Sequence, residues 1–196
     1  MPVVFRRALP TVAVAVLSLA LMTACSPQET PDDPDTGPNP TGEPTGEPAP
    51  SLSAQPTGTA IDATCDELVT ADTLYVYNPN FVPIDPYTPR EGSAAASALS
   101  YDGVACRWQN QTSGQNIDIS AAELDEASLT ALKNAAFEDS ELVPTYGDEA
   151  YFSVEGEVGI AQVFQGPYWI VVESPAFFEP GDATEIVQSI IDGLAA

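Results

Sequence analysis

The sequence contains no histidine and only five basic residues among its 196. Without histidine, neither a Ser-His-Asp triad nor a Cys-His pair can be assembled. The sequence also lacks a G-x-S-x-G nucleophile elbow, a phosphate-binding P-loop and a dinucleotide-binding glycine pattern. We therefore predict no catalytic residue and no cofactor, and expect a protein that is not an enzyme.

Positive charge is scarce against 29 acidic residues, which give a net charge of −24. This charge excludes nucleic acid as a partner, because binding a phosphate backbone depends on lysine and arginine. Acidic clusters, such as those at residues 138–141 and 148–149, are expected to be solvated surface, and no metal site is predicted. A hydrolase that works with carboxylates alone stays open as an alternative.

The apolar run near the N-terminus is too short to cross a bilayer. Residues 12–22 are apolar except for Ser18, whereas a membrane span takes roughly 20 apolar residues. Arg6 and Arg7 precede the run, and the small Thr23 and Ala24 follow it, which is the layout of an export signal.

Residues 22–25, Met-Thr-Ala-Cys, resemble the bacterial lipobox, with methionine where that motif usually has leucine. The resemblance implies cleavage before Cys25 and a diacylglyceryl group on its sulfur. Residues 1–24 would then be a lipoprotein signal peptide, and Cys25 would hold the protein on the extracytoplasmic face of the cell membrane. The alternative is an ordinary secreted protein with an incidental cysteine.

Loss of residues 1–24 would remove Arg6 and Arg7. Three basic residues would remain against 29 acidic ones, a net charge of −26. Such a chain is repelled by an anionic lipid surface, so we expect the acyl group, rather than a basic helix, to provide membrane binding.

Residues 25–60 have the composition of a disordered tether. Nine prolines lie between residues 26 and 60, together with a T-G-E-P tandem repeat at 41–48, and Leu52 is the one large aliphatic side chain. Such a segment cannot bury enough apolar surface to fold. We expect it to be a spacer between the membrane and the cell wall.

Of the three cysteines, one is assigned to the lipid anchor and two are left to pair with each other. With Cys25 assigned to lipid, Cys65 and Cys106 form an even pair, which predicts a disulfide in an oxidising compartment. Closing this loop is expected to stabilise the domain by about 4 kcal/mol on the chain-entropy model.

Residues 61–196 are expected to form a single domain. Helical patterns occur at 63–71 with Asp62 as cap, at 93–99, at 126–137 and from Asp182 onward, where Asp182 and Glu185 suggest a capping box. Alternation at 104–109 and 117–121 predicts a hairpin, and that at 150–155, 158–165 and 168–174 a three-strand meander. Tight turns make neighbouring strands antiparallel. We predict an α+β fold with a sheet of about five antiparallel strands packed with three to four helices.

Residues 75–89 are predicted to form an irregular loop that contains four prolines and four aromatic residues. Held between prolines, these rings could present a binding surface for a glycan, a peptide or a lipid at little entropic cost. The candidate binding residues are Tyr75, Tyr77, Phe81 and Tyr87. The alternative, which the usual burial of aromatic side chains favours, is that these rings cover one sheet face.

Two segments resemble a family of actinobacterial cell-envelope lipoproteins with a two-cysteine domain of unknown function. Residues 65–74 match its C-x-x-L-x-T-x-x-x-L pattern, and residues 103–108 match G-x-x-C-x-W. The same plan of lipobox, polar spacer and two-cysteine domain is present. A looser likeness to the PsbP-type sheet-and-helix fold implies an accessory or binding role.

The sequence therefore predicts a membrane-anchored, non-catalytic binding or accessory module of the cell envelope. Its partners would be the membrane, through lipid on Cys25, and an envelope protein, glycan or lipid. A carrier of lipid or another small molecule is the first alternative, and a carboxylate-dependent hydrolase of wall material is the second.

Overall fold

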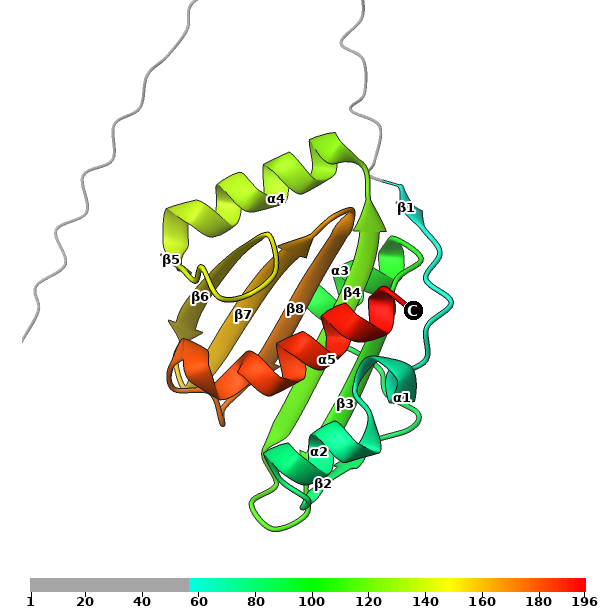
Figure 1. Ribbon diagram of the computed structural model, residues 1–196, viewed down its shortest axis with the longest axis vertical. Coiled ribbons are helices and arrows are strands. Elements are labelled where there is room, and N and C mark those ends of the chain that lie inside the picture. The colour runs from blue at the N-terminus through cyan, green and yellow to red at the C-terminus, as the bar shows by residue number, and fades with distance from the viewer. Residues whose placement is uncertain (1–56) are drawn as a thin grey trace, which may run out of the picture. The chain divides into compact units, whose positions relative to one another are not determined.

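The computed structural model describes residues 57–196 (Figure 1). The predictions for the signal peptide, for Cys25 and for the tether up to residue 56 lie outside this part of the chain. Within residues 57–196, no helix combines the length and the apolar character that a membrane span needs.

An antiparallel sheet with the strand order β2-β3-β4-β8-β7-β6-β5 forms the centre of the fold. The predicted hairpin consists of β3 (Val104–Asn110) and β4 (Asn116–Leu124), and the meander consists of β6 (Glu149–Glu155), β7 (Val158–Gln165) and β8 (Tyr168–Ser174). Since β8 pairs with β4, hairpin and meander make one sheet. The short strands are β1 (Gly58–Thr59), β2 (Phe81–Pro83) and β5 (Glu141–Leu142).

The α+β class and the antiparallel pairing are confirmed. Within residues 57–196, however, the sheet has eight strands rather than about five, and there are five α-helices rather than three to four. The three additional strands are only two or three residues long, which is too short to show an alternating pattern. Gly58 and Thr59 form β1 by pairing with Leu124 and Glu123 of β4. The sheet therefore includes two residues of the range predicted for the tether.

The predicted helix at 63–71 is two short helices, α1 (Cys65–Leu68) and α2 (Ala71–Tyr77). Thr64 begins α1 in a capping box with Glu67, so Asp62 is not the cap. Thr70 caps α2 by accepting a hydrogen bond from the backbone N–H of Thr73. The second helix also corrects the prediction of an irregular stretch from residue 75, which instead contains the end of α2 and all of β2.

The remaining helices lie where the sequence predicts them. Ser93 caps α3 (Ala94–Ser100) and Asp125 caps α4 (Glu126–Asp139). The final helix α5 (Thr184–Leu194) follows a 3₁₀ turn, η1 (Pro180–Ala183). The capping box before it joins Asp182 to Glu179 rather than to Glu185.

Helices cover both faces of the sheet, and each face has its own core. In Figure 1, α5 crosses the near face, where α1 and α2 also lie. Trp108, Ile119 and Val172 on this face pack against Ile186 and Ile190 of α5. The other core joins residues of α3 and α4 to the opposite side of the strands. We call the two sides the α5 face and the α4 face.

Cys65 and Cys106 form the predicted disulfide, with 5.8 Å between their Cα atoms. The bond joins the first residue of α1 to β3.

Candidate functional site

The structure places the four aromatic residues of the predicted binding loop in three different environments. Tyr75 lies on α2 with 74% of its surface exposed. Phe81 is buried, with its ring centroid 5.8 Å from that of Tyr77. Tyr77 also contacts Phe177, so both rings extend the core of the α5 face. Tyr87 lies over the opposite face, where it lines a polar hollow.

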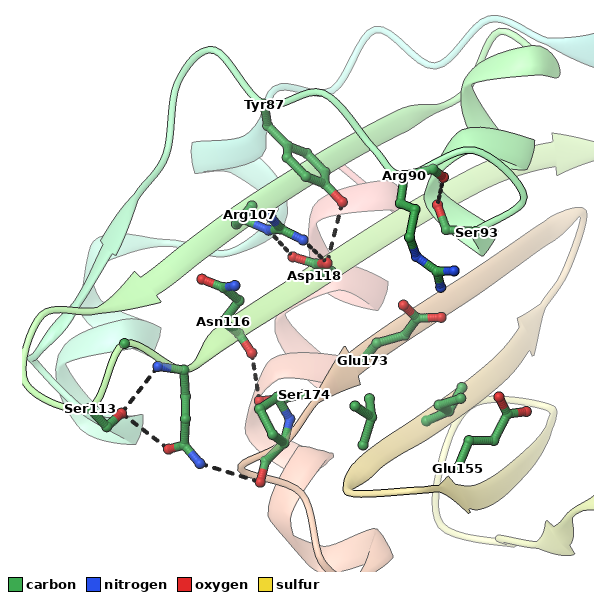
Figure 2. Close-up of a pocket in the computed structure, with 15 residues that line it drawn as sticks. Tyr87, Arg90, Ser93, Arg107, Ser113, Asn116, Asp118, Glu155, Glu173 and Ser174 are labelled. Carbon is green, nitrogen blue, oxygen red and sulfur yellow. Dashed lines mark hydrogen bonds and ion pairs between the residues drawn. The ribbon is translucent and has the colours of Figure 1, made fainter.

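The polar hollow opens on the α4 face, between the N-terminal end of α3 and the ends of β6, β7 and β8 (Figure 2). Its volume is about 560 Å³. Most lining residues are polar or charged: Tyr87, Arg90, Ser93, Arg107, Ser113, Gly114, Gln115, Asn116, Asp118, Glu155, Val158, Ile160, Glu173, Ser174 and Pro175.

Strand register aligns the central residues of the hollow in one row across four strands. Arg107 of β3 pairs with Asp118 of β4, Asp118 pairs with Glu173 of β8, and Glu173 pairs with Ile160 of β7. Because side chains alternate along a strand, all four point to the α4 face, while their neighbours along each strand point to the α5 face. The row is therefore fixed by the sheet itself rather than by a loop.

Arg107 and Asp118 form a bidentate ion pair in this row. Nε and Nη2 of Arg107 donate to the two carboxylate oxygens of Asp118. The Tyr87 ring covers the guanidinium, with 4.5 Å between the ring centroid and Cζ, and the Tyr87 hydroxyl donates to Asp118 at 3.3 Å. Burial and the nearby Asp118 raise the pKa of Tyr87 to about 12, so this hydroxyl stays protonated at neutral pH.

Glu173 and Arg90 face one another in the hollow without forming an ion pair. Figure 2 shows their charged groups pointing toward each other with no hydrogen bond or ion pair between them. Burial, and next the charge of Asp118, raise the pKa of Glu173 above its ordinary value, and the charge of Arg90 partly opposes this shift. The hollow thus holds a half-buried carboxyl group that the described residues leave without a direct partner.

The rim of the hollow is formed by two loops that are held by hydrogen bonds. The segment after β2 continues its pairing at Ile84, whose N–H donates to the Arg107 carbonyl, and ends where the Ser93 hydroxyl donates to the Arg90 carbonyl. In the β3–β4 turn, the Ser113 hydroxyl donates to the Gln115 side chain. Both loops thus have fixed ends beside the row.

A second hollow, of about 620 Å³, lies between α1 and the C-terminal end of α5. Its lining contains acidic and apolar residues but no basic one. It therefore offers no convergence of opposite charges, and we take the polar hollow as the candidate site. Within residues 57–196, no group of three or more acidic or cysteine side chains is arranged to hold a metal ion.

The sequence indicates Tyr87 as a candidate residue but does not indicate the row of charged residues beneath it. Arg107 and Asp118 occupy the polar positions of an alternating pattern, and such positions usually face solvent. The available signal was that two of the three basic residues beyond residue 24 lie within 18 positions of each other, at residues 90 and 107.

Comparison of the chain with protein-family models found no matching model, and the comparisons with curated proteins and with solved structures found no match either.

Proposed function

We propose that the chain is a lipid-anchored, non-catalytic binding module of the cell envelope, and that the polar hollow holds a small polar ligand. The lipobox-like residues 22–25 support the anchor. The Cys65–Cys106 disulfide supports an oxidising compartment, because cytosolic thiols are kept reduced. The same proposal includes the looser likeness to the PsbP-type fold, which implies an accessory or binding role.

The observation that carries the binding site is the placement of positive charge. Residues 57–196 contain three basic residues, Arg90, Arg107 and Lys133, against 23 acidic ones, since six of the 29 acidic residues precede residue 57. Two of the three line the polar hollow. In so acidic a domain, this concentration of guanidinium groups beside carboxyl groups provides directional hydrogen bonding for a polar ligand.

The polarity of the hollow favours a wall peptide, a wall glycan or a polar segment of an envelope protein over an acyl chain. A lipid carrier needs a cavity that is largely apolar. Here the floor contains Arg107, Asp118 and Glu173, with Val158 and Ile160 as its aliphatic part. The lipid-carrier alternative therefore has less support from this site.

The binding proposal is tested by titrating isotopically labelled whole protein with soluble cell-wall fragments and following amide shifts by NMR. We expect the largest shifts around Arg107, Asp118 and Glu173. Arg107→Gln should weaken binding by about tenfold or more, since it removes both the guanidinium and the support of Asp118. Lys133→Gln is the matched control outside the hollow. Equal binding by Arg107→Gln, or shifts confined to other surfaces, would contradict the proposal.

The anchor is tested by Cys25→Ser. Without an acyl group, the acidic protein has no means to stay at an anionic membrane, so we expect it to move from the membrane fraction to the medium. A variant that stays in the membrane fraction would refute the lipid anchor.

One observation favours the hydrolase as a second candidate function. The raised pKa of Glu173, next to the Asp118 carboxylate, is what a carboxylate-based mechanism requires of its acid. Asp118, however, is held by Arg107 and Tyr87, which reduces its ability to act as base or nucleophile. Release of soluble products from wall glycan, lost in Glu173→Gln, would establish this function in place of binding alone.

A further inference from the structure

We infer that the polar hollow takes a ligand that carries both an ammonium group and a carboxylate, as an amino acid or a short peptide does. The ammonium group would lie at Glu173 and the carboxylate at Arg90. This inference rests on the proposed function, because it names the ligand class of the same hollow.

The first argument is that both side chains carry charges without an ion-pair partner, as does the exposed Glu155, which also lines the hollow. In the described part of the chain the ion pairs are Arg107–Asp118 and Lys133–Glu149. Arg90 is thus the one basic residue of residues 57–196 that has no carboxylate within 4.0 Å. Figure 2 shows the Glu173 carboxylate likewise without a dashed line to any partner, pointing toward the guanidinium of Arg90.

An ammonium group suits the Glu173 side of the hollow. The carboxylate is half-buried, and Asp118, which stands beside it in the sheet, repels its charge. A cation placed there is attracted by the Glu173 carboxylate and compensates for the solvation that this group loses by burial. The negative field of the whole domain also draws a cationic group toward the surface.

A carboxylate suits the Arg90 side. Arg90 is an exposed residue, and its guanidinium can make two parallel N–H···O bonds to a carboxylate. The Arg107 guanidinium is less suited to this role, because Asp118 already neutralises it and occupies its Nε and Nη2 edge. A ligand with negative charge alone is disfavoured, since Asp118, Glu155 and Glu173 line the same hollow.

The test is calorimetric titration of the whole purified protein, at neutral pH and low salt, with alanyl-alanine and two blocked forms of it. N-Acetylation removes the ammonium group, and C-terminal amidation removes the carboxylate. We expect each blocked form to bind about tenfold more weakly than the parent dipeptide, or worse, which is the loss of one well-placed charged contact. Free alanine, as a further arm, distinguishes an amino-acid site from a peptide site.

Two variants assign each charge to its side chain. In Arg90→Gln, amidation should no longer weaken binding, and in Glu173→Gln, acetylation should no longer do so. Lys133→Gln and Glu138→Gln, which remove one charge of each sign away from the hollow, should keep the wild-type pattern. Circular dichroism and melting temperature confirm that the variants are folded.

Full-strength binding of either blocked form to the wild type would overturn the inference, because one charge would then suffice. The inference would also be overturned if amidation weakened binding to Arg90→Gln as much as it weakens binding to the wild type. Failure of all the dipeptide and amino-acid probes would also overturn it. The proposed function is decided separately, by the titration with wall fragments, which does not require a zwitterionic ligand.

Discussion

Arg107 and Asp118 lie half-buried on the α4 face, where each neutralises the other. Their side chains are 30% and 18% exposed. Asp118→Asn keeps the shape but leaves the guanidinium under the Tyr87 ring without its counter-charge. We expect a loss of about 1–3 kcal/mol in the free energy of unfolding, measured by urea denaturation at pH 7.

The other ion pair of the described residues provides the control for that measurement. Lys133 and Glu149 are 3.0 Å apart, and each side chain is about one-third exposed. Pairs of this kind contribute at most about 1 kcal/mol, so Lys133→Gln should change stability less than Asp118→Asn does. Equal effects of the two substitutions would mean that the partial burial of Arg107 and Asp118 does not increase their contribution to the free energy of unfolding.

Glu173 should make stability depend on pH. Because its pKa in the folded protein is raised above 4.5, the folded state binds a proton more tightly than the unfolded state does. The contribution of Glu173 is therefore complete below about pH 4.5 and is lost as pH rises through the folded pKa. Glu173→Gln should be more stable than the wild type at pH 7.

Urea denaturation of both proteins between pH 4 and pH 8 measures this difference. The difference in free energy of unfolding between Glu173→Gln and the wild type should shrink as pH falls and vanish near pH 4. Glu138→Gln, on the exposed side of α4, serves as the control for removal of an acidic residue. A difference that is independent of pH would show that the Glu173 charge is not the cause.

At the scale of elements, long strands and turns were predictable from sequence, whereas short elements were not. The meander was located to within a residue at each end, because its strands alternate and its turns contain Gly156 and Gly166, both with positive φ. β1, β2 and β5 depend on a partner strand for their conformation. With two or three residues each, they are too short to show the alternation of apolar and polar residues that predicts a strand. The first helix was predicted too long because Thr70 interrupts it by capping α2.

Gly159 of β7 lets the chain after β8 approach the sheet closely. An added Cβ would overlap the Phe177 carbonyl oxygen and lie 2.7 Å from the Phe177 Cβ. Gly159→Ala should therefore destabilise the domain by about 1–3 kcal/mol through overpacking, measured as a lower urea midpoint. Gly181→Ala is the matched control, because its nearest heavy atom would be 3.9 Å away. Similar effects of the two substitutions would contradict the argument.

The disulfide couples α1, a helix of four residues, to β3. Since it closes a loop with a sequence separation of 41, reduction should lower the free energy of unfolding by about 4 kcal/mol on the chain-entropy model. Amide hydrogen exchange should accelerate in α1 more than in the meander. The double variant Cys65→Ser, Cys106→Ser should match the reduced protein and be unaffected by reductant. Uniform acceleration across the domain would contradict a local role for the bond.

At the scale of the whole molecule, the α+β class followed from the sequence, but the site did not. Asp118 and Glu173 are neighbours only because β8 of the meander pairs with β4 of the hairpin. This contact joins positions 55 residues apart, and no local pattern specifies it. The hollow is a product of that pairing, and along each strand its charged residues occupy the alternating positions that ordinarily face solvent.

The charge of the whole domain leads to a last prediction. Residues 57–196 hold 23 acidic and three basic residues, a net charge of −20, and such an excess destabilises the compact state through self-repulsion.

Raising sodium chloride from 0.01 M to 0.15 M shortens the screening length from about 30 Å to about 8 Å. Repulsion acts between many distant carboxylates, whereas attraction is confined to two close ion pairs in this part of the chain. Screening should therefore weaken repulsion more than attraction, and the urea midpoint should rise with salt. A midpoint that falls over this range would mean that the two ion pairs outweigh the repulsion of the remaining acidic residues.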